Sequence, residues 1–299
     1  MLFYLKWTPI ALLLLTPLIY ATFTLRSRPL APHPYFANGD FLVIAHRGGM
    51  GLAPENTLEA FARSAALGVD VLEMDLRQSK DGVPIILHDR RVDRTTNGRG
   101  RADSLNLRAL RALDAGYHFK PGHQGYTQRN QNLKIPTLDE VLSTFPTMRF
   151  LIEIKDDSDH LALSLCQAIE RFEVVDQVIA ASFHDGSLAT FRQACPKVAT
   201  ALSSGAGLSF TLLHWLRLDA AYHPTNQAFQ IPLNLGDIRL VDRRFVDRAH
   251  AHNAQVHVWT VNDTATMRHL ISIGVDGIIT DYPDRLLQLL NRLPSEENQ

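Results

Sequence analysis

Three acidic side chains lie in segments that are otherwise apolar. Glu73 and Asp75 lie in VLEMDLRQ, residues 71–78, and Glu153 lies in LIEIK, residues 151–155. Alternate side chains of a strand point to opposite faces, so each segment has one apolar face and one acidic face. Carboxylates gathered on one buried surface repel each other unless a cation compensates them, and their oxygens suit Mg²⁺ or Ca²⁺. The alternative is that these acids form ion pairs with nearby cationic residues, namely Arg47, Arg77 or Lys155.

Two histidines stand at the ends of apolar segments. His46 ends FLVIAH, residues 41–46, and His88 lies near the end of VPIILHD, residues 83–89. Imidazole is the usual proton-transfer group near neutral pH, so both are candidate catalytic residues. Most of the 13 histidines in the chain are expected to be structural or exposed, and these two are singled out by position. Arg47 follows His46 and offers a forked cation suited to a phosphate.

Other residues near these segments have a structural interpretation beside a chemical one. In PENTLEAF, Asn56 is expected to cap a helix, although Glu55 and Asn56 could also reach a site because this loop follows the first strand. Asp89 either orients His88 or begins a turn. In VHVWTVN, Trp259 would form an apolar wall for a substrate if it points inward, and would pack in the core otherwise.

The elements that must position these residues alternate regularly after residue 40. Strands are expected at residues 41–46, 71–78, 149–155, 177–183, 198–204, 228–233, 255–262 and 276–281, with an extra hairpin arm near 84–88. Helical patterns separate most of them, which predicts a parallel sheet. Eight such units fit a (β/α)₈ TIM barrel of about 250 residues, whose active site lies at the carboxyl ends of the strands. A doubly wound open sheet is the alternative.

The remaining segments suggest a domain layout. Residues 41–292 form the expected catalytic domain, and the polar, glycine-rich residues 90–135 form a small insertion lying over one end of the barrel. Residues 26–40 are rich in proline and are expected to be a linker. Residues 293–299 form a polar tail.

The N-terminal segment predicts a membrane anchor. WTPIALLLLTPLIYATFTL, residues 7–25, contains no charged residue and approaches the ~20 apolar residues that cross a bilayer. We therefore expect a single-pass transmembrane helix within residues 1–25. A cleaved signal peptide and a soluble helix are the alternatives. Lys6 on one side and Arg26 on the other leave the orientation open.

Composition and cysteine content limit the class of protein and the disulfides that the chain can form. The chain has 299 residues and a net charge of −1, which suits one large globular domain and gives no electrostatic case for nucleic-acid binding. Cys166 stands at helical spacing among apolar residues and is expected to be a buried thiol. Two distant cysteines, Cys166 and Cys195, do not predict a disulfide framework.

Five blocks, in order, resemble motifs of the glycerophosphodiester phosphodiesterase family. They are AHRGGMGLAPENTLEAF, GVDVLEMDLRQSKDGVPIILHD, LIEIK, VHVWTVN and GVDGIITDYPD, and the resemblance covers about residues 41–290. It implies a TIM barrel with a small insertion. It also implies hydrolysis of a phosphodiester with a glycerol arm, such as glycerophosphocholine, to sn-glycerol 3-phosphate and an alcohol.

The same resemblance implies roles for individual residues. His46 and His88 would be the acid/base pair, Glu73, Asp75 and Glu153 would hold Mg²⁺ or Ca²⁺ with Glu55 close by, and Arg47 and Lys155 would contact phosphate. A lysophospholipid is an alternative substrate, suggested by the apolar N-terminus. A catalytically inactive phosphodiester-binding barrel is a further alternative, although no metal acid or histidine of the motifs is missing.

Overall fold

The computed structural model describes residues 20–37, 39–122 and 125–293. Most of the expected anchor, residues 1–19, therefore lies outside the described residues, as does most of the polar tail. Residues 20–26 are helical. Within the described ranges, no helix combines the length and the apolar character needed to cross a membrane.

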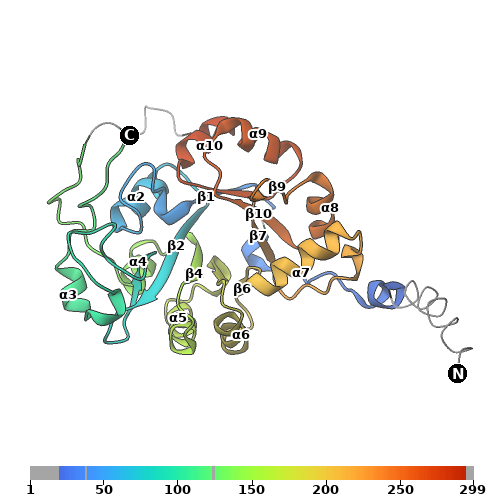
Figure 1. The fold of residues 1–299 in the computed structure, drawn as a ribbon, viewed down its shortest axis with the longest axis horizontal. Coiled ribbons are helices and arrows are strands. Elements are labelled where there is room, and N and C mark those ends of the chain that lie inside the picture. The colour runs from blue at the N-terminus through green and yellow to red at the C-terminus, as the bar shows by residue number, and fades with distance from the viewer. Residues whose placement is uncertain (1–19, 38, 123–124, 294–299) are drawn as a thin grey trace, which may run out of the picture.

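Eight parallel strands of the described chain form a nearly closed barrel (Figure 1). They are β1 (Leu42–Ala45), β2 (Val71–Gln78), β4 (Arg149–Ile154), β5 (Val178–Ala181), β6 (Ala199–Thr200), β7 (Ala228–Pro232), β10 (Gln255–Trp259) and β11 (Gly277–Thr280). They are ordered β6-β5-β4-β2-β1-β11-β10-β7. The ring is joined between β6 and β7 by the single parallel bridge from Ala201 to Ala228. The expected barrel is confirmed as a nearly closed ring of eight strands, and the alternative of an open doubly wound sheet is not observed in the described chain.

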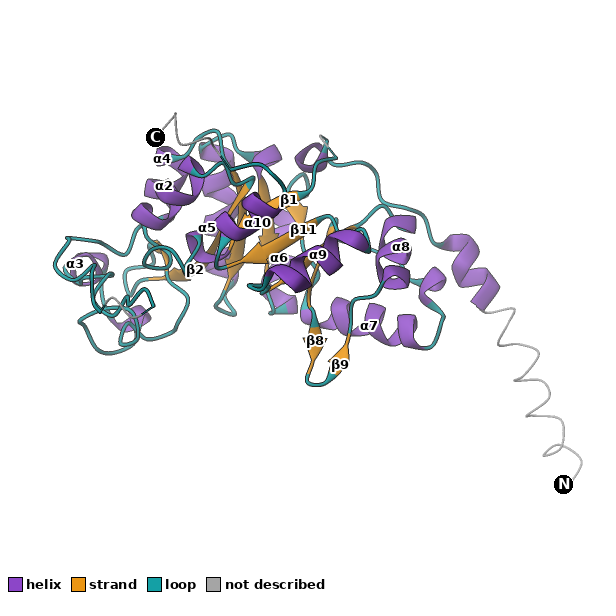
Figure 2. Cartoon of the chain, turned by 90° about the horizontal axis from the view of Figure 1, so that it is seen from above, coloured by secondary structure: helices purple, strands orange, loops and turns teal. Residues whose placement is uncertain are grey.

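Each barrel strand is followed in the chain by a helix on the outside (Figure 2). The helices are α2 (Leu58–Ala66), α4 (Leu138–Thr144), α5 (Asp159–Arg171), α6 (Asp185–Ala194), α7 (Ser204–Trp215), α8 (Arg243–Ala251), α9 (Thr264–Ser272) and α10 (Pro283–Leu289). Several begin at side-chain caps that satisfy free N–H groups. Thr137 and Glu140 form a capping box at α4, for example.

Strand alternation divides the apolar core into two parts. Leu72, Met74 and Leu76 belong to the larger cluster between the strands and the helices. Val71 and Leu151 belong to the smaller cluster inside the barrel. Glu73 and Asp75 alternate with the outward residues of β2 and therefore face the barrel interior.

The insertion packs beside β2, and its Arg111 forms an ion pair with Glu140 of α4. Strand β3 (Pro84–Ile86) runs antiparallel to β2. The insertion contains a short helix, α3 (Leu107–Arg111), and has its own small apolar cluster, which includes Ile85, Val92 and Leu110. Figure 1 shows α3 at the flank of the barrel.

The segment expected as a linker is docked against the barrel. The short helix η1 (Pro34–Phe36) places Tyr35 in the inner cluster beside Leu42 and Val71, which begin their strands. The Leu30 N–H donates to the His252 carbonyl oxygen at 3.0 Å. Tyr35 therefore covers the amino end of the barrel, opposite the end where an active site is expected.

The expectation of a free thiol at Cys166 is wrong. Cys166 of α5 and Cys195, which follows α6, form a disulfide with a Cα–Cα distance of 5.8 Å. Helices α5 and α6 pack side by side, so two residues 29 positions apart in sequence meet (Figure 1). The spacing of the two cysteines in the sequence does not indicate that their helices are neighbours in space.

Candidate active site

A pocket opens at the carboxyl ends of the strands, and its two sides differ in character. One side is charged and includes His46, Arg47, Glu73, His88, Glu153 and Lys155. The other side is mainly apolar and includes Phe183, Leu202, Trp259 and Ile279. The structure thus brings together these residues, which lie in or just after eight different strands.

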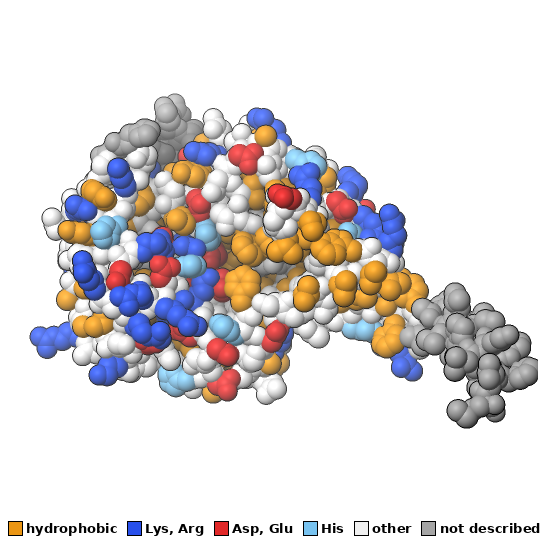
Figure 3. Space-filling view, viewed as in Figure 1, with side chains coloured by type: hydrophobic (Ala, Val, Ile, Leu, Met, Phe, Trp, Pro, Cys, Tyr) orange, Lys and Arg blue, Asp and Glu red, His pale blue; other side chains and the backbone are white. Residues whose placement is uncertain are grey.

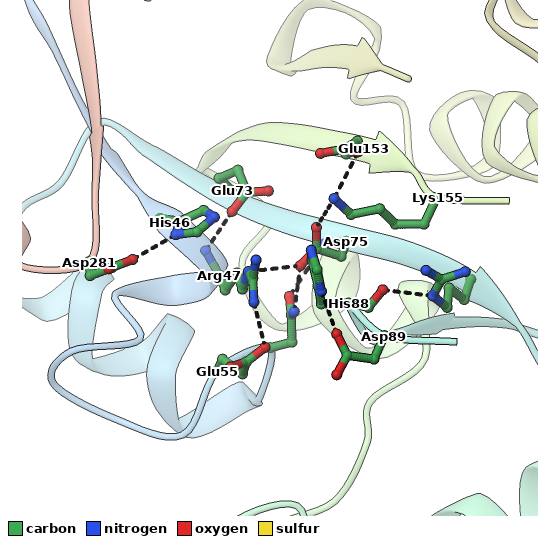
Figure 4. Close-up of polar contacts among 12 residues, drawn as sticks. His46, Arg47, Glu55, Glu73, Asp75, His88, Asp89, Glu153, Lys155 and Asp281 are labelled. Atoms are coloured by element: carbon green, nitrogen blue, oxygen red, sulfur yellow. Dashed lines mark hydrogen bonds and ion pairs between the residues drawn. The ribbon is translucent and has the colours of Figure 1, made fainter. Parts of the chain in front are cut away.

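The three acids of β2 and β4 converge in this pocket (Figure 4). Glu73 and Asp75 are 4% and 1% exposed. Asp75 and Glu153 are register partners on neighbouring strands. One oxygen from each of Glu73, Asp75 and Glu153 lies within 4.8 Å of the others. Such a spacing of hard oxygen donors suits a divalent cation.

Cationic side chains compensate Asp75 most strongly. Lys155 Nζ lies 3.0 Å from Asp75 Oδ1, and Arg47 Nε lies 3.4 Å from Asp75 Oδ2. Asn56 Nδ2 donates to Asp75 Oδ2 at 2.8 Å. Burial by itself raises the pKa of Asp75, but Lys155 and Arg47 outweigh burial and lower it. Asp75 is therefore held as a carboxylate.

Glu73 and Glu153 are less well compensated. Burial, together with the neighbouring charge of Asp75, raises the pKa of Glu73 to about 7. Burial also raises the pKa of Glu153. Lys155 Nζ lies 2.8 Å from Glu153 Oε1 but not at a hydrogen-bonding angle, and among the described residues this buried oxygen has no hydrogen-bond donor. For both acids burial outweighs the neighbouring positive groups, and the positive charge of a bound cation would favour their ionised forms.

His46 is fixed by an acid from the opposite end of the chain. Its Nδ1 lies 2.6 Å from Asp281 Oδ1, just after β11, and Asn262 Nδ2 donates to Asp281 Oδ2 at 2.7 Å. Burial lowers the pKa of His46, but the hydrogen bond to Asp281 and the charge of Glu73 outweigh burial, so the pKa is raised. Because Nδ1 is engaged, Nε2 is the ring nitrogen left for a substrate.

His88 is fixed by its neighbour in sequence. Its Nδ1 lies 2.6 Å from Asp89 Oδ1, and Arg94 Nε donates to Asp89 Oδ2 at 2.6 Å. Burial lowers the pKa of His88, and the charges of Asp75 and Asp89 offset this only in part. Relative to an ordinary histidine, the pKa of His46 is therefore raised and the pKa of His88 is lowered. Figure 4 shows them on either side of Arg47.

Glu55 and Asn56 have clear positions near the acids. Glu55 accepts hydrogen bonds from Arg47 Nη1 at 2.9 Å and from Arg94 Nη1 at 2.6 Å, so ion pairs hold it beside the cluster. The expected cap at Asn56 is wrong, because Thr57 caps α2 by accepting from the Ala60 N–H. Asn56 has a φ of 57°, which turns its amide toward Asp75.

The apolar side of the pocket centres on Trp259. Its ring packs edge-to-face against Phe183, with the ring centroids 5.9 Å apart. Gln230, in the strand beside Trp259, also lines the pocket, and its Nε2 has no hydrogen-bond acceptor among the described residues. The sequence reading missed Phe183, Gln230 and Asp281. Only Asp281 had a visible signal, its position as the last residue of the strand expected at residues 276–281.

The chain is similar to proteins of one family along most of its length. The model of the "Glycerophosphoryl diester phosphodiesterase family" matches residues 46–285. A glycerophosphodiester phosphodiesterase of Caldanaerobacter subterraneus is 34% identical over 257 residues, which cover 84% of this chain and 98% of the relative. Lysophospholipase D GDPD3 of Mus musculus is 24% identical over 275 residues, which cover 84% of this chain and 82% of that protein.

A solved structure adds a ligand to the comparison. An Oleispira antarctica phosphodiesterase, determined with the product sn-glycerol-3-phosphate, superposes with a TM-score of 0.68 at 26% identity. The match covers 83% of this chain and 96% of that one.

Proposed function

The chain belongs to the glycerophosphoryl diester phosphodiesterase family, and we propose that its acid cluster and two histidines carry out the reaction. The protein is a phosphoric diester hydrolase that converts glycerophosphodiesters to sn-glycerol 3-phosphate and an alcohol. The site assignment depends on one observation: three inward carboxylates lie between two histidines. Each histidine is hydrogen-bonded to an aspartate of its own.

Glu73, Asp75 and Glu153 would hold a divalent cation, and their oxygen donors favour Mg²⁺ or Ca²⁺. The fit is supported by the buried Glu153 oxygen, which accepts no hydrogen bond from the described residues, and by the raised pKa of Glu73. When bound, the cation supplies positive charge to a phosphate oxygen. Glu55 stays a neighbouring acid, paired with Arg47 and Arg94.

The histidines divide the proton transfers. The lowered pKa of His88 favours the neutral ring, so His88 accepts the proton of the nucleophile. The raised pKa of His46 favours the protonated ring, so His46 donates a proton to the leaving alkoxide. The nucleophile is either water or the neighbouring glycerol hydroxyl. Arg47 and Lys155, which line the pocket, contact the phosphate, and Trp259 forms an apolar wall for the substrate.

A panel of variants tests this assignment. Release of glycerol 3-phosphate from glycerophosphocholine is measured with and without Mg²⁺ and Ca²⁺ for Glu73→Gln, His46→Asn and His88→Asn. We expect the two histidine variants to lose at least about a hundredfold, which is the contribution of one acid or base. Glu73→Gln should lose activity because it removes a ligand of the cation. Near-normal turnover in any of these variants, or full activity after chelation, contradicts the assignment.

A lysophospholipid is the second candidate substrate. The mainly apolar side of the pocket, formed by Phe183, Leu202 and Trp259, supports it, as does the mouse relative named a lysophospholipase D. In that reaction the same bond is broken in a lipid that keeps one acyl chain. Turnover of glycerophosphocholine and of lysophosphatidylcholine, measured side by side, separates the two substrates.

A membrane location completes the proposal. The uncharged residues 7–25 support a single-pass anchor, and the Cys166–Cys195 disulfide favours an oxidising compartment for the barrel. Alkaline extraction of membranes is expected to leave the full chain in the pellet. Blocking of free thiols before isolation is expected to show Cys166 and Cys195 oxidised in the native protein. Release of the full chain by alkali contradicts the anchor, and free thiols at both cysteines contradict the oxidising compartment.

A further inference from the structure

Helix α7 has apolar side chains on the face that it turns to solvent. Leu208, Leu212 and Leu216 recur every four residues along α7 and its C-terminal end, and they are 51–70% exposed. Phe210 and His214 on the opposite face are buried. A helix that is apolar all round is normally buried on every side. No described residue covers the outward face of α7, so it calls for a partner outside the described chain.

A small hairpin adds a second apolar projection after β7. Its strands, β8 (Asn234–Leu235) and β9 (Ile238–Arg239), pair Leu235 directly with Ile238. Opposed residues of an antiparallel pair point to the same side, and these two are 59% and 53% exposed. Figure 2 shows the hairpin projecting from the barrel next to α7.

These surfaces continue into the mouth of the pocket. Leu202, just before α7, lines the pocket, and Phe183 at its rim is more than half exposed. Figure 3 shows apolar side chains running from the middle of this face over α7 toward the N-terminal helix, while charged side chains gather on the other side. The apolar surface therefore joins the reaction pocket to the end of the chain from which the uncharged residues 7–25 lead.

Basic residues stand directly beside the apolar ones. Exposed arginines follow exposed leucines at two places, namely Leu25–Arg26 and Leu216–Arg217. Apolar side chains next to arginines are typical of surfaces that enter the headgroup region of a membrane, where arginine meets lipid phosphate. The charge pattern thus favours a phospholipid surface as the occupant over an apolar protein partner.

We propose that this apolar face, formed by Phe183, Leu208, Leu212, Leu216, Leu235 and Ile238, lies on a phospholipid bilayer. In that orientation the mouth of the pocket sits at the headgroup level. A lipid phosphodiester reaches the acid cluster there without leaving the membrane, and its acyl chain stays along α7. This inference rests on the proposed function for the chemistry of the pocket and adds the surface from which the substrate is taken.

The test uses the full chain reconstituted in phosphatidylcholine vesicles that contain phosphatidylglycerol. The variants are Leu208→Ser/Leu212→Ser on α7 and Leu235→Ser/Ile238→Ser on the hairpin. Leu163→Ser is the matched control, because Leu163 is an exposed leucine of α5 on another side of the barrel. Turnover is measured on vesicle-borne lysophosphatidylcholine and on dissolved glycerophosphocholine.

We expect each double variant to lose about tenfold in turnover of the vesicle-borne lipid, because two apolar side chains no longer enter the bilayer. Turnover of glycerophosphocholine should equal that of Leu163→Ser, which also shows that the variants fold. If the wild type fails on glycerophosphocholine, the proposed function fails. If the double variants match the control on both substrates, the proposal that this face lies on a bilayer is contradicted, and the proposed function is not affected.

Trp215, exposed at the end of α7, gives a direct readout that does not depend on turnover. Brominated phosphatidylcholine in the vesicles is expected to quench the part of the emission that Trp215→Phe removes. Absence of this quenching overturns the proposal. It would mean that the N-terminal residues or a second copy of the chain cover α7.

Discussion

His46 Nδ1 lies 2.6 Å from Asp281 Oδ1, so the histidine that follows the first barrel strand is held by an aspartate that follows the last. Strands β1 and β11 are paired neighbours, with Ala45 in register with Thr280, and this pairing sets the contact. Barrel closure thus brings together two residues that are 235 positions apart in sequence.

Asp281→Asn should impair catalysis and shift its pH dependence. The carboxylate orients the His46 ring and raises the pKa of His46, so its loss lowers that pKa. His46 acts as the acid, and activity should therefore decline at a lower pH on the basic limb of the profile. We expect kcat to fall about a hundredfold. A kcat profile from pH 5 to 9 checks this, with the exposed Asp139→Asn as the control. An unchanged basic limb would show that Asp281 does not act through His46.

Metal affinity should depend on pH through Glu73. Burial and the charge of Asp75 raise the pKa of Glu73 to about 7 in the metal-free protein. A proton then competes with the cation below that pH, so affinity should weaken by up to about tenfold for each pH unit on the acid side. Calorimetric titration with Mg²⁺ or Ca²⁺ at pH 6 and pH 8 checks this. Glu73→Gln should bind more weakly and show less pH dependence. Equal wild-type affinities at the two pH values would contradict the prediction.

The sequence, together with the family resemblance, was sufficient for the barrel and for the charged side of the pocket. Alternation in VLEMDLRQ and LIEIK indicates that Glu73, Asp75 and Glu153 face inward, because a period of two survives in any buried strand. The structure places these acids together at the carboxyl ends of neighbouring strands. Their chemical roles stay predictions that the variants above test.

Other features could not be predicted because their signals are not periodic or not local. Helix α7 lacks an amphipathic pattern, since its leucines lie on both its buried and its exposed sides, and it begins with Gly205 and Gly207, which are poor helix formers. The partners of Asp281 and Cys195 depend on which strands and helices are neighbours in space. That information arises only once the barrel closes.

Reduction of the disulfide should destabilise the α5–α6 side of the barrel. The Cys166–Cys195 bond closes a loop across a separation of 29 residues, which stabilises the native state by about 3.6 kcal/mol in the chain-entropy model. We expect the melting temperature to fall by roughly 6–10 °C in reductant or in Cys166→Ser/Cys195→Ser. Reductant should have no further effect on the double variant, which controls for other actions of the reagent. An equal melting temperature in all samples would show that the bond does not contribute.

Buried His257 should make the protein sensitive to acid independently of the active site. It is fully buried on β10, and within the described part of the chain neither ring nitrogen has a hydrogen-bond partner. Burial lowers the pKa of His257 to about 4 from an ordinary value of 6.5. Between these two values the unfolded chain binds a proton that the native state excludes. Stability therefore decreases as the pH falls through this window, by about 2 kcal/mol at pH 5.

Urea unfolding of the wild type, His257→Leu and the exposed control His269→Leu at pH 7 and pH 5 tests this expectation. His257→Leu removes the titrating group and leaves an apolar side chain in an apolar site, so its stability should change less between the two pH values. The control should lose as much stability at pH 5 as the wild type does. If His257→Leu loses just as much, acid sensitivity arises from other groups and His257 is not its source.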